Sequence, residues 1–475
     1  MRTIPREQVL RRVQAENGWW EEPRQIPAHY LRLRRRAYFD LLWPLATDRS
    51  IRRAVLLMGP RRVGKTVLIH HTIQKLIDGG CAPSRLCYLS VDHPLYNGCG
   101  LQDLLDFYVE AAQVDLAAGG VFVFFDEIQY LKNWEVHLKS LVDSYPGVKF
   151  LASGSAAAAL RLKSNESGAG RFTDFLLPPL TFYEYLDLLG EAGLVEVDEE
   201  NEELSKIVDI ERLNQSFVHY LNFGGYPEVM FSETIQSDPA RFVKGDIIDK
   251  VLLRDLPGLY GIEDIQELNH LFTTLAFNTA NEVSLEQLSR NSGVAKNTIK
   301  RYIEYLEAAF LIKVVHRIDR SSKRFQRANF FKVYLTNPSM RSALFSPIDA
   351  DDEAIGSLTE TAIFAQWFHA GPNLHYARWD NGEVDIVQLN RRQKPSWAVE
   401  VKWTDRFAER PGELKSVVQF CHSNGLAEVT VTSRTVRTVQ TFEGIEIHFV
   451  PASLYCYVVG YNNLRARLPL AATRS

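Results

Sequence analysis

The stretch AVLLMGPRRVGKTVLIHHTIQKLI, residues 54–77, decides the fold of the N-terminal part of this chain. An apolar run at residues 54–58 is followed by a loop at residues 59–66 and then by a segment that reads as a helix. The loop fits the pattern G-x-x-x-x-G-K-[ST]. A loop of this kind turns backbone N–H groups inward, where they cradle phosphate oxygens at the helix N-terminus. The stretch therefore predicts a nucleotide phosphate site rather than a chance glycine-rich turn.

The side chains of this loop indicate which nucleotide chemistry it serves. Lys65 supplies a point charge to the terminal phosphates, and the Thr66 hydroxyl can ligate Mg²⁺. We therefore expect ATP as the ligand and Mg²⁺ as its cofactor. The residues of this stretch predicted to contact the nucleotide are Gly59, Pro60, Arg61, Arg62, Val63, Gly64, Lys65, Thr66 and Val67.

A second apolar run, VFVFFDEIQ at residues 121–129, leads into two adjacent carboxylates. It belongs to an alternation of apolar runs and helical stretches over residues 53–155, which is typical of a parallel sheet with crossover helices. Ligands bind at the carboxyl ends of strands in such sheets. We expect Asp126 to hold the Mg²⁺ ion and Glu127 to polarise the attacking water. An exposed strand end is the alternative, and the interpretation we favour is a nucleotide hydrolase.

Two further residues are candidates for the same site. Ser155 follows the apolar run KFLASGS, where its hydroxyl either senses the γ-phosphate or caps the helix that follows. Arg171 follows the glycine-containing turn SGAG. It either stabilises transition-state charge, in the same chain or across a subunit boundary, or is a surface arginine.

The segment at residues 284–312 has the spacing of two helices around a turn at Gly293. The residues that follow, 313–335, can form the two-stranded wing of a winged helix. A basic wing beside a recognition helix suits a DNA backbone, although winged helices also serve as domain spacers. The wing holds one acid, Asp319, against seven basic residues: Lys313, Arg317, Arg320, Lys323, Arg324, Arg327 and Lys332.

The C-terminal part carries three acids and a lysine on two strand-like runs and one helix-like stretch. Asp385 and Glu400 lie on two strand-like runs, Lys402 follows on the face of Glu400, and Glu360 lies on a helix-like stretch upstream. The set resembles the core of PD-(D/E)xK nucleases, although Val384 replaces the usual proline. In that interpretation Asp385, Glu400 and Glu360 hold Mg²⁺ or Mn²⁺, while Lys402 and Glu400 serve catalysis. The alternative is a salt-bridged core or binding surface without activity.

Composition limits the class of protein. A hydrophobic content of 46% and a charged content of 24% are ordinary globular values, and 475 residues suggest roughly two to four domains. The net charge of −4 argues against a chain that coats nucleic acid along its whole surface. Five cysteines without a CxxC pair favour a reducing interior. No apolar run approaches the roughly eighteen residues of a membrane span, so we expect a cytoplasmic protein without membrane contact.

Six stretches resemble a widespread prokaryotic family of AAA-type ATPases related to archaeal and STAND-like ATPases. The resemblance covers residues 30–455 and implies a C-terminal domain with a restriction-endonuclease-like fold. The stretch NFGGYPEV is characteristic, and its glycines and proline suggest a rigid turn at a domain junction. The stretches are LLMGPRRVGKT, FFDEIQYLKNWE, LASGSA, GAGRF, LPPLTFYEYL and NFGGYPEV.

These expectations define an α/β protein with a P-loop NTPase parallel sheet, a helical and winged-helix middle and a C-terminal α/β restriction-endonuclease-like domain. The predicted function is a Mg²⁺-dependent ATPase associated with DNA, with a nuclease-like C-terminal domain. A non-cutting regulatory ATPase that binds DNA or a protein partner is the alternative, and the expected assembly is a homo-oligomer or a complex with another protein. The predicted domains are residues 1–50 (helical segment), 51–175 (ATPase core), 176–282 (helical region), 283–345 (winged helix) and 346–475 (nuclease-like domain).

Overall fold

The computed structural model describes residues 5–155, 170–197, 206–321, 329–369 and 373–465. The chain divides into two compact units, Met1–Leu177 with Arg467–Ser475, and Pro178–Ala466. None of the described helices has both the length and the apolarity to cross a bilayer.

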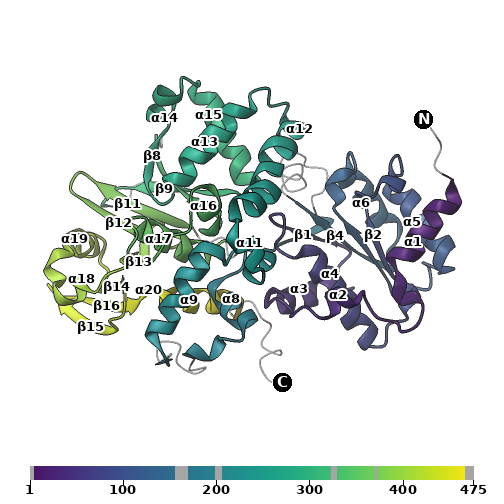
Figure 1. Cartoon of the computed structure of the whole chain (residues 1–475), viewed down its shortest axis with the longest axis horizontal. Coiled ribbons are helices and arrows are strands. Elements are labelled where there is room, and N and C mark those ends of the chain that lie inside the picture. Colours follow the sequence, from purple (N-terminus) through teal and green to yellow (C-terminus); the bar gives the residue numbers. More distant parts are fainter. Residues whose placement is uncertain (1–4, 156–169, 198–205, 322–328, 370–372, 466–475) are drawn as a thin grey trace. The chain divides into compact units, whose positions relative to one another are not determined.

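The first unit is built on a parallel sheet whose described strands run in the order β2-β3-β4-β1-β5. Every residue of β1, β3 and β4 is buried, as expected where helices cover both faces of a parallel sheet. Figure 1 shows α5 and α6 on one side of this sheet and α3 and α4 on the other. The strands are β1 (Ala54–Met58), β2 (Leu86–Ser90), β3 (Val121–Asp126), β4 (Val148–Gly154) and β5 (Phe172–Leu176). The helices are α1 (Arg6–Glu16), α2 (Ala28–Leu31), α3 (Tyr38–Thr47), α4 (Lys65–Asp78), α5 (Leu101–Ala112) and α6 (Trp134–Ser144).

The second unit contains a mixed sheet with the strand order β15-β16-β14-β13-β12-β11-β9-β10-β8. Strands β8 to β10, which were expected to form a separate winged helix, join the strands of the predicted nuclease-like domain where β9 pairs in parallel with β11. The two predicted domains therefore share one sheet. The strands are β8 (Glu282–Ser284), β9 (Ile312–Ile318), β10 (Phe330–Leu335), β11 (Leu374–Trp379), β12 (Gly382–Leu389), β13 (Pro395–Glu400), β14 (Glu428–Ser433), β15 (Thr438–Phe442) and β16 (Ile445–Pro451). A small separate pair is formed by β6 (Val195–Glu196) and β7 (Lys206–Ile207).

The second unit also contains the helices that pack on the mixed sheet. Two π-helical segments, Ala240–Asp249 and Val251–Asp255, precede α12. The helix-turn-helix spacing is present as α14 and α15, separated by Gly293 in the left-handed conformation. The helices are α8 (Phe182–Leu189), α9 (Ile210–Phe223), α10 (Pro227–Met230), α11 (Glu233–Ser237), α12 (Leu256–Tyr260), α13 (Ile265–Phe277), α14 (Leu285–Ser292), α15 (Lys296–Ala308), α16 (Ser339–Leu344), α17 (Ile355–Ala365), α18 (Arg406–Glu409), α19 (Lys415–Asn424) and α20 (Ala452–Arg465).

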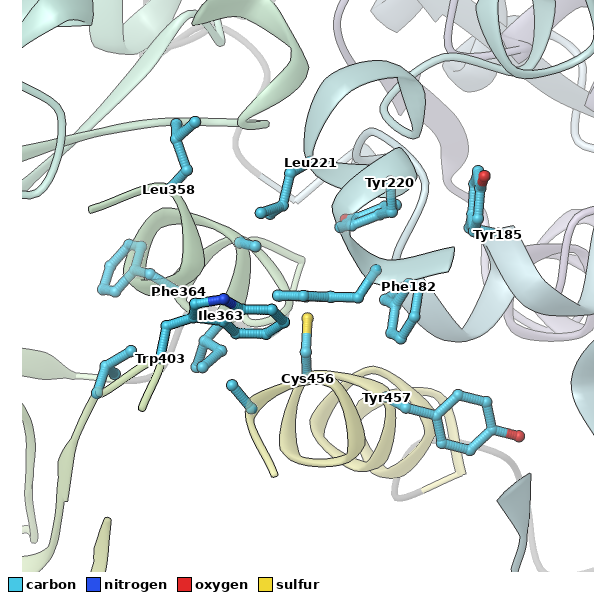
Figure 2. Close-up of a cluster of buried hydrophobic side chains, with 14 of the residues drawn as sticks. Phe182, Tyr185, Tyr220, Leu221, Leu358, Ile363, Phe364, Trp403, Cys456 and Tyr457 are labelled. Atoms are coloured by element: carbon cyan, nitrogen blue, oxygen red, sulfur yellow. The ribbon is translucent and has the colours of Figure 1, made fainter. Parts of the chain in front are cut away.

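One hydrophobic core joins segments that are far apart in the sequence of this unit. Side chains of α8, α9, α17 and α20 meet in it, together with Trp403 from the segment after β13 (Figure 2). Phe182 packs edge-to-face against Phe217, and Trp403 stacks on Phe217 with ring centroids 5.5 Å apart. This core fixes α17 beside the sheet, and α17 carries one of the predicted site residues, Glu360.

The stretch NFGGYPEV, for which the sequence offered no chemistry, ends α9 at a point of close packing. A Cβ atom added to Gly225 would lie 2.5 Å from the Oδ1 atom of Asn337 and 2.8 Å from the Oγ atom of Ser339. The carbonyl of Gly225 also accepts a hydrogen bond from the backbone N–H of Leu180. A larger residue at this position would force Asn337 and Ser339 of the loop after β10 to shift.

Candidate functional sites

The phosphate loop predicted at residues 59–66 lies between β1 and the N-terminus of α4. A Cβ atom at Gly59 would lie 2.2 Å from the carbonyl oxygen of Leu177, so the loop can pass this point only with a glycine. Lys65 is buried, and its ammonium donates to the carbonyls of Gly59 at 3.0 Å and Pro60 at 2.8 Å. The lysine is thus held inside the loop, at the positive end of a helix, where a phosphate group is favoured.

Asp126 ends β3 and connects the loop to the neighbouring strands. One of its carboxylate oxygens accepts hydrogen bonds from the Thr66 hydroxyl at 2.7 Å and from the Tyr88 hydroxyl at 2.8 Å. The other accepts a hydrogen bond from the hydroxyl of Ser153 on β4. Hydroxyl and carboxylate oxygens are the ligands that Mg²⁺ prefers, so Thr66 and Asp126 fit the ion that the loop implies.

Glu127 follows Asp126 at the end of β3 in the left-handed conformation, with a φ angle of 56°. Its backbone N–H donates to Ser153 Oγ and Asp126 Oδ1, both at 3.2 Å, and its side chain accepts from the Gln129 amide. Burial raises the pKa of Glu127, Lys65 acts in the opposite direction, and the Asp126 carboxylate raises it further. A carboxylate with a raised pKa beside the phosphate loop is a suitable acceptor for a proton from water.

The structure supports a place in the phosphate site for Ser155 but not for Arg171. The Ser155 hydroxyl is buried without a hydrogen-bond partner among the described residues, while its N–H donates to Gln129 Oε1 at 3.2 Å. The residues that would form the helix it was expected to cap, 156–169, lie outside the described residues.

Arg171 precedes β5 and pairs with Asp143 at 2.5 Å. Its carbonyl bonds to the first residue of β1, at the edge opposite the phosphate loop, so a role for Arg171 in the site of its own chain is wrong. A role across a subunit boundary stays a prediction.

Two residues near the phosphate loop were missed by the sequence interpretation. Arg36 is buried and donates to the carbonyl of Val63 at 3.0 Å, so a residue of the N-terminal segment holds the phosphate loop. It lies in the basic run RLRRRAY, where the sequence alone does not distinguish it from its exposed neighbours. Tyr88 on β2 is the other, and it reaches the site because β2 pairs in parallel with β3.

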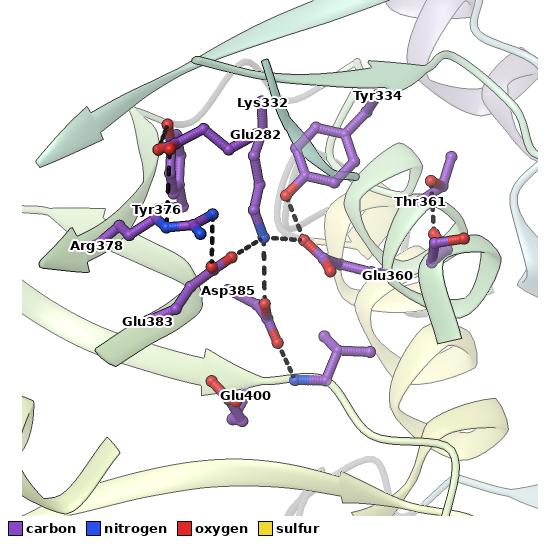
Figure 3. A network of polar contacts seen from close by, with 12 residues as sticks. Glu282, Lys332, Tyr334, Glu360, Thr361, Tyr376, Arg378, Glu383, Asp385 and Glu400 are labelled. Carbon is purple, nitrogen blue, oxygen red and sulfur yellow. Dashed lines mark hydrogen bonds and ion pairs between the residues drawn. The ribbon is translucent and has the colours of Figure 1, made fainter. Parts of the chain in front are cut away.

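The second site lies in the second unit and brings together all four residues predicted from the C-terminal sequence. Figure 3 shows three of them, Glu360, Asp385 and Glu400. Lys402 Nζ lies 2.7 Å from Glu400 Oε1 and 3.9 Å from Asp385 Oδ2. Asp385 Oδ2 also accepts from the backbone N–H of Val401 at 2.9 Å. We call Lys332, Glu360, Asp385, Glu400 and Lys402 the acid–lysine cluster.

Lys332 was assigned to the basic wing, and this was wrong. It lies on β10 with 2% of its side chain exposed, and its ammonium contacts three carboxylates: Glu360 at 2.8 Å, Glu383 at 2.7 Å and Asp385 at 3.2 Å. Glu360 Oε1 also accepts from the Tyr334 hydroxyl at 2.6 Å. A buried lysine is stable only where carboxylates compensate its charge, and the cluster supplies them.

The cluster changes the proton affinity of its members. Burial and the neighbouring Asp385 carboxylate raise the pKa of Glu400 to about 8 and that of Glu360 to about 7. Burial acts to raise the pKa of Asp385 as well, but Lys332 and Lys402 hold it below its usual value. Glu400 is 8% exposed, and its Oε2 atom has no hydrogen-bond partner among the described residues. A buried carboxylate oxygen without a partner, beside a second carboxylate, fits a hard cation such as Mg²⁺ or Mn²⁺.

The predicted DNA-binding surface is only partly described. Arg317 pairs with Glu282 at 3.5 Å and Lys313 with Glu307 at 2.7 Å, so both also serve the packing of this unit. On α15, the predicted recognition helix, the four residues expected to reach a DNA groove are all exposed: Lys296, Asn297, Lys300 and Arg301. The wing residues Lys323, Arg324 and Arg327 lie outside the described residues.

The parallel sheet and the Gly59–Thr66 loop define the first unit as a P-loop nucleotide-binding domain. Residues 51–186 match the sequence profile of a family described as an AAA domain. Residues 214–352 match a family described as a domain of unknown function, DUF8612.

Two distant relatives are similar to this chain over most of its length. An uncharacterized protein of Methanocaldococcus jannaschii is 25% identical over 358 residues, which cover 71% of this chain and 73% of the relative. An uncharacterized protein of Haemophilus influenzae is 22% identical over 403 residues, or 83% of this chain and 92% of the relative.

Solved structures show only weak likeness. The ORC1 protein of Aeropyrum pernix in complex with DNA has a TM-score of 0.28 and 13% identity, covering 71% of this chain and 91% of that chain. AMPPCP-bound DnaA from Aquifex aeolicus has a TM-score of 0.28 and 16% identity, covering 60% of this chain and 90% of that chain. Likeness at these scores carries no conclusion about function.

Proposed function

We propose that the first unit binds ATP with Mg²⁺ and hydrolyses it. The observation that carries the proposal is the 2.7 Å hydrogen bond between Thr66 and Asp126, which joins the phosphate loop to the carboxylate end of β3. Thr66 and Asp126 would hold the Mg²⁺ ion, which supplies charge neutralisation at the phosphates when bound. The match to an AAA domain supports the same assignment.

Each residue of this site has a separate task in the proposal. Lys65 leaves the carbonyls of the loop and neutralises the terminal phosphates of ATP. Glu127 accepts the proton of the attacking water, and its raised pKa makes it a stronger base than an exposed glutamate. Ser155 offers a buried hydroxyl without a described partner as a sensor of the terminal phosphate.

The test of this proposal is release of inorganic phosphate from Mg²⁺–ATP by the purified full chain. We expect turnover by the wild type and none by Lys65→Ala. Lys415→Ala, an exposed lysine on α19, is the matched control and should hydrolyse ATP at the wild-type rate. A wild-type chain without turnover, with or without DNA, would reject the proposal.

For the second unit we propose DNA as the partner and a divalent-cation site in the acid–lysine cluster. The exposed face of α15 supports the first assignment, and the Glu400 Oε2 atom without a partner supports the second. Asp385 and Glu400 would hold Mg²⁺ or Mn²⁺, which supplies Lewis acidity at a scissile phosphate, while Lys402 orients or deprotonates a water. Glu360 is the third predicted ligand.

The alternative is that the chain is a regulatory ATPase whose second unit binds DNA or a protein partner without cutting DNA. The ion pairs of Lys332 and Lys402 favour this alternative, because they already compensate much of the acidic charge. Cleavage of plasmid DNA in Mg²⁺ or Mn²⁺ separates the two. Loss of cleavage in Glu400→Ala would support the nuclease, whereas absence of cleavage by the wild type would favour the regulatory ATPase.

A further inference from the structure

Lys332 occupies one side of the acid–lysine cluster. Its ammonium lies within hydrogen-bond distance of Glu360 Oε1 and Asp385 Oδ1 and also contacts Glu383 (Figure 3). Lys402 lies on the other side, against Glu400 Oε1 and Asp385 Oδ2. The two oxygens of Asp385 therefore face two different lysines.

The two sides of the cluster differ in whether their carboxylate oxygens have hydrogen-bond donors. On the Lys332 side, Glu360 Oε1 and Asp385 Oδ1 both have donors at 3.2 Å or less. On the Lys402 side, Glu400 Oε2 has no partner among the described residues. An ammonium at hydrogen-bond distance from several carboxylates stands where a hard cation would otherwise bind, because both need the same oxygens.

We infer that Lys332 is a built-in cation that excludes a divalent ion from the Glu360 side of the cluster and leaves only the Glu400 side for one. This inference rests on the proposed metal site for its second part. It makes Glu360 a partner of Lys332 rather than a metal ligand. It also assigns a function in the cluster to β10, a strand of the predicted winged helix.

The inference predicts a gain of binding when the ammonium is removed. Lys332→Met keeps the length and apolar stem of the side chain but leaves Glu360, Glu383 and Asp385 close together without their shared cation. Glu383 keeps its ion pair with Arg378 and Asp385 its contact with Lys402, but the cation shared by the three carboxylates is gone, and a divalent ion binds as its replacement. Relative to the wild type, Lys332→Met should bind about one further equivalent of Mn²⁺ per chain.

The experiment is a Mn²⁺ titration of the purified full chain without nucleotide, read as free Mn²⁺ by electron paramagnetic resonance, together with thermal unfolding. Lys332→Met should gain the further equivalent, and its Tm should rise with Mn²⁺ more than that of the wild type. Lys313→Met, on the neighbouring strand β9 and paired with Glu307, is the matched control and should bind as the wild type does. The double variant Lys332→Met with Glu360→Gln should lose the gain.

The outcomes separate this inference from the proposed metal site. A wild type that binds no Mn²⁺ at the cluster, with a gain in Lys332→Met, rejects the metal site but supports the role of Lys332. A folded Lys332→Met that binds no more Mn²⁺ than the wild type overturns the inference. If Lys332→Met folds only with Mn²⁺ while the double variant folds without it, the inference is supported. A double variant that also needs Mn²⁺ contradicts it.

Discussion

The hydroxyl of Thr66 donates a 2.7 Å hydrogen bond to Asp126 at the end of β3. Thr66 lies at the start of α4, which the phosphate loop joins to β1, and β4 separates β1 from β3 in the sheet. The hydrogen bond spans this gap because both residues lie at the carboxyl edge of the sheet, where the phosphate loop turns toward β3. Ser153, at the same edge of β4, donates to the other oxygen of Asp126. Two strands, β3 and β4, and the N-terminus of α4 thus contribute to one polar centre, beside the ammonium of Lys65.

Replacing Lys65 by alanine should abolish ATP hydrolysis and weaken ATP binding. The variant lacks the ammonium that lies in the phosphate loop, and a hydrogen bond to a charged group contributes about 2 kcal/mol, or roughly thirtyfold in Kd. Binding of a fluorescent ATP analogue measures the change. Equal affinity of Lys65→Ala and the wild type would contradict the assignment of the loop.

The phosphate site could be predicted because its chemistry is local in the sequence. The loop and the carboxylates of Asp126 and Glu127 directly follow the apolar runs that form β1 and β3, so strand order alone places them at one edge. The same rule could have corrected Arg171, because that residue precedes the run FTDFL and therefore lies at the opposite edge. Arg36 and Tyr88 enter the site through tertiary packing, for which the sequence contains no periodic signal.

Replacing Asp385 by alanine should remove the stabilisation by divalent cations while ATP hydrolysis in the first unit persists. Asp385 is the member of the acid–lysine cluster that contacts both lysines, and its loss removes a carboxylate from the proposed ion. Thermal unfolding with and without Mg²⁺ measures the effect. Asp380→Ala, an exposed aspartate between β11 and β12, is the control and should keep the wild-type response. An unchanged Mg²⁺ response in Asp385→Ala would refute the metal site.

Lys332 shows where interpretation of the C-terminal sequence reached its limit. Glu360, Asp385, Glu400 and Lys402 were predicted to meet, and they do. Lys332 was counted among the charges of the wing because it lies in the basic stretch 313–332, and the sequence does not show that residues 331–335 of its strand are all buried. The parallel pairing of β9 with β11 turns that face toward the cluster, and such a pairing between distant segments is not visible in the sequence.

Neutralising Lys300 and Arg301 on α15 should weaken DNA binding about equally for different sequences and reduce its salt dependence. Each lost phosphate contact lowers the slope of log K against log salt by about 0.9. Fluorescence anisotropy over a salt series measures it. The control is a double variant of Arg391 and Arg392, which are exposed in the turn between β12 and β13. The same slope in both double variants would assign α15 to a structural role.

Replacing Gly225 by alanine should destabilise the second unit by about 1–3 kcal/mol, because the new Cβ atom would overlap Asn337 and Ser339. Urea unfolding measures the difference. Gly356→Ala is the matched control, since nothing lies within 4 Å of a Cβ atom at that position in α17. The control should be neutral or more stable by up to about 1 kcal/mol, as alanine favours helix. Equal stability of the two variants would show that the loop after β10 can move away.

The central claim is that Glu127 activates water for ATP hydrolysis, and the most direct test compares Glu127→Gln with the wild type. The amide keeps the size of the side chain but cannot accept the proton. ATP binding should stay close to that of the wild type, and phosphate release should fall by about a hundredfold or more. The measurement is single-turnover release of inorganic phosphate from Mg²⁺–ATP, with binding measured on the same samples. Release by Glu127→Gln at the wild-type rate would contradict the account.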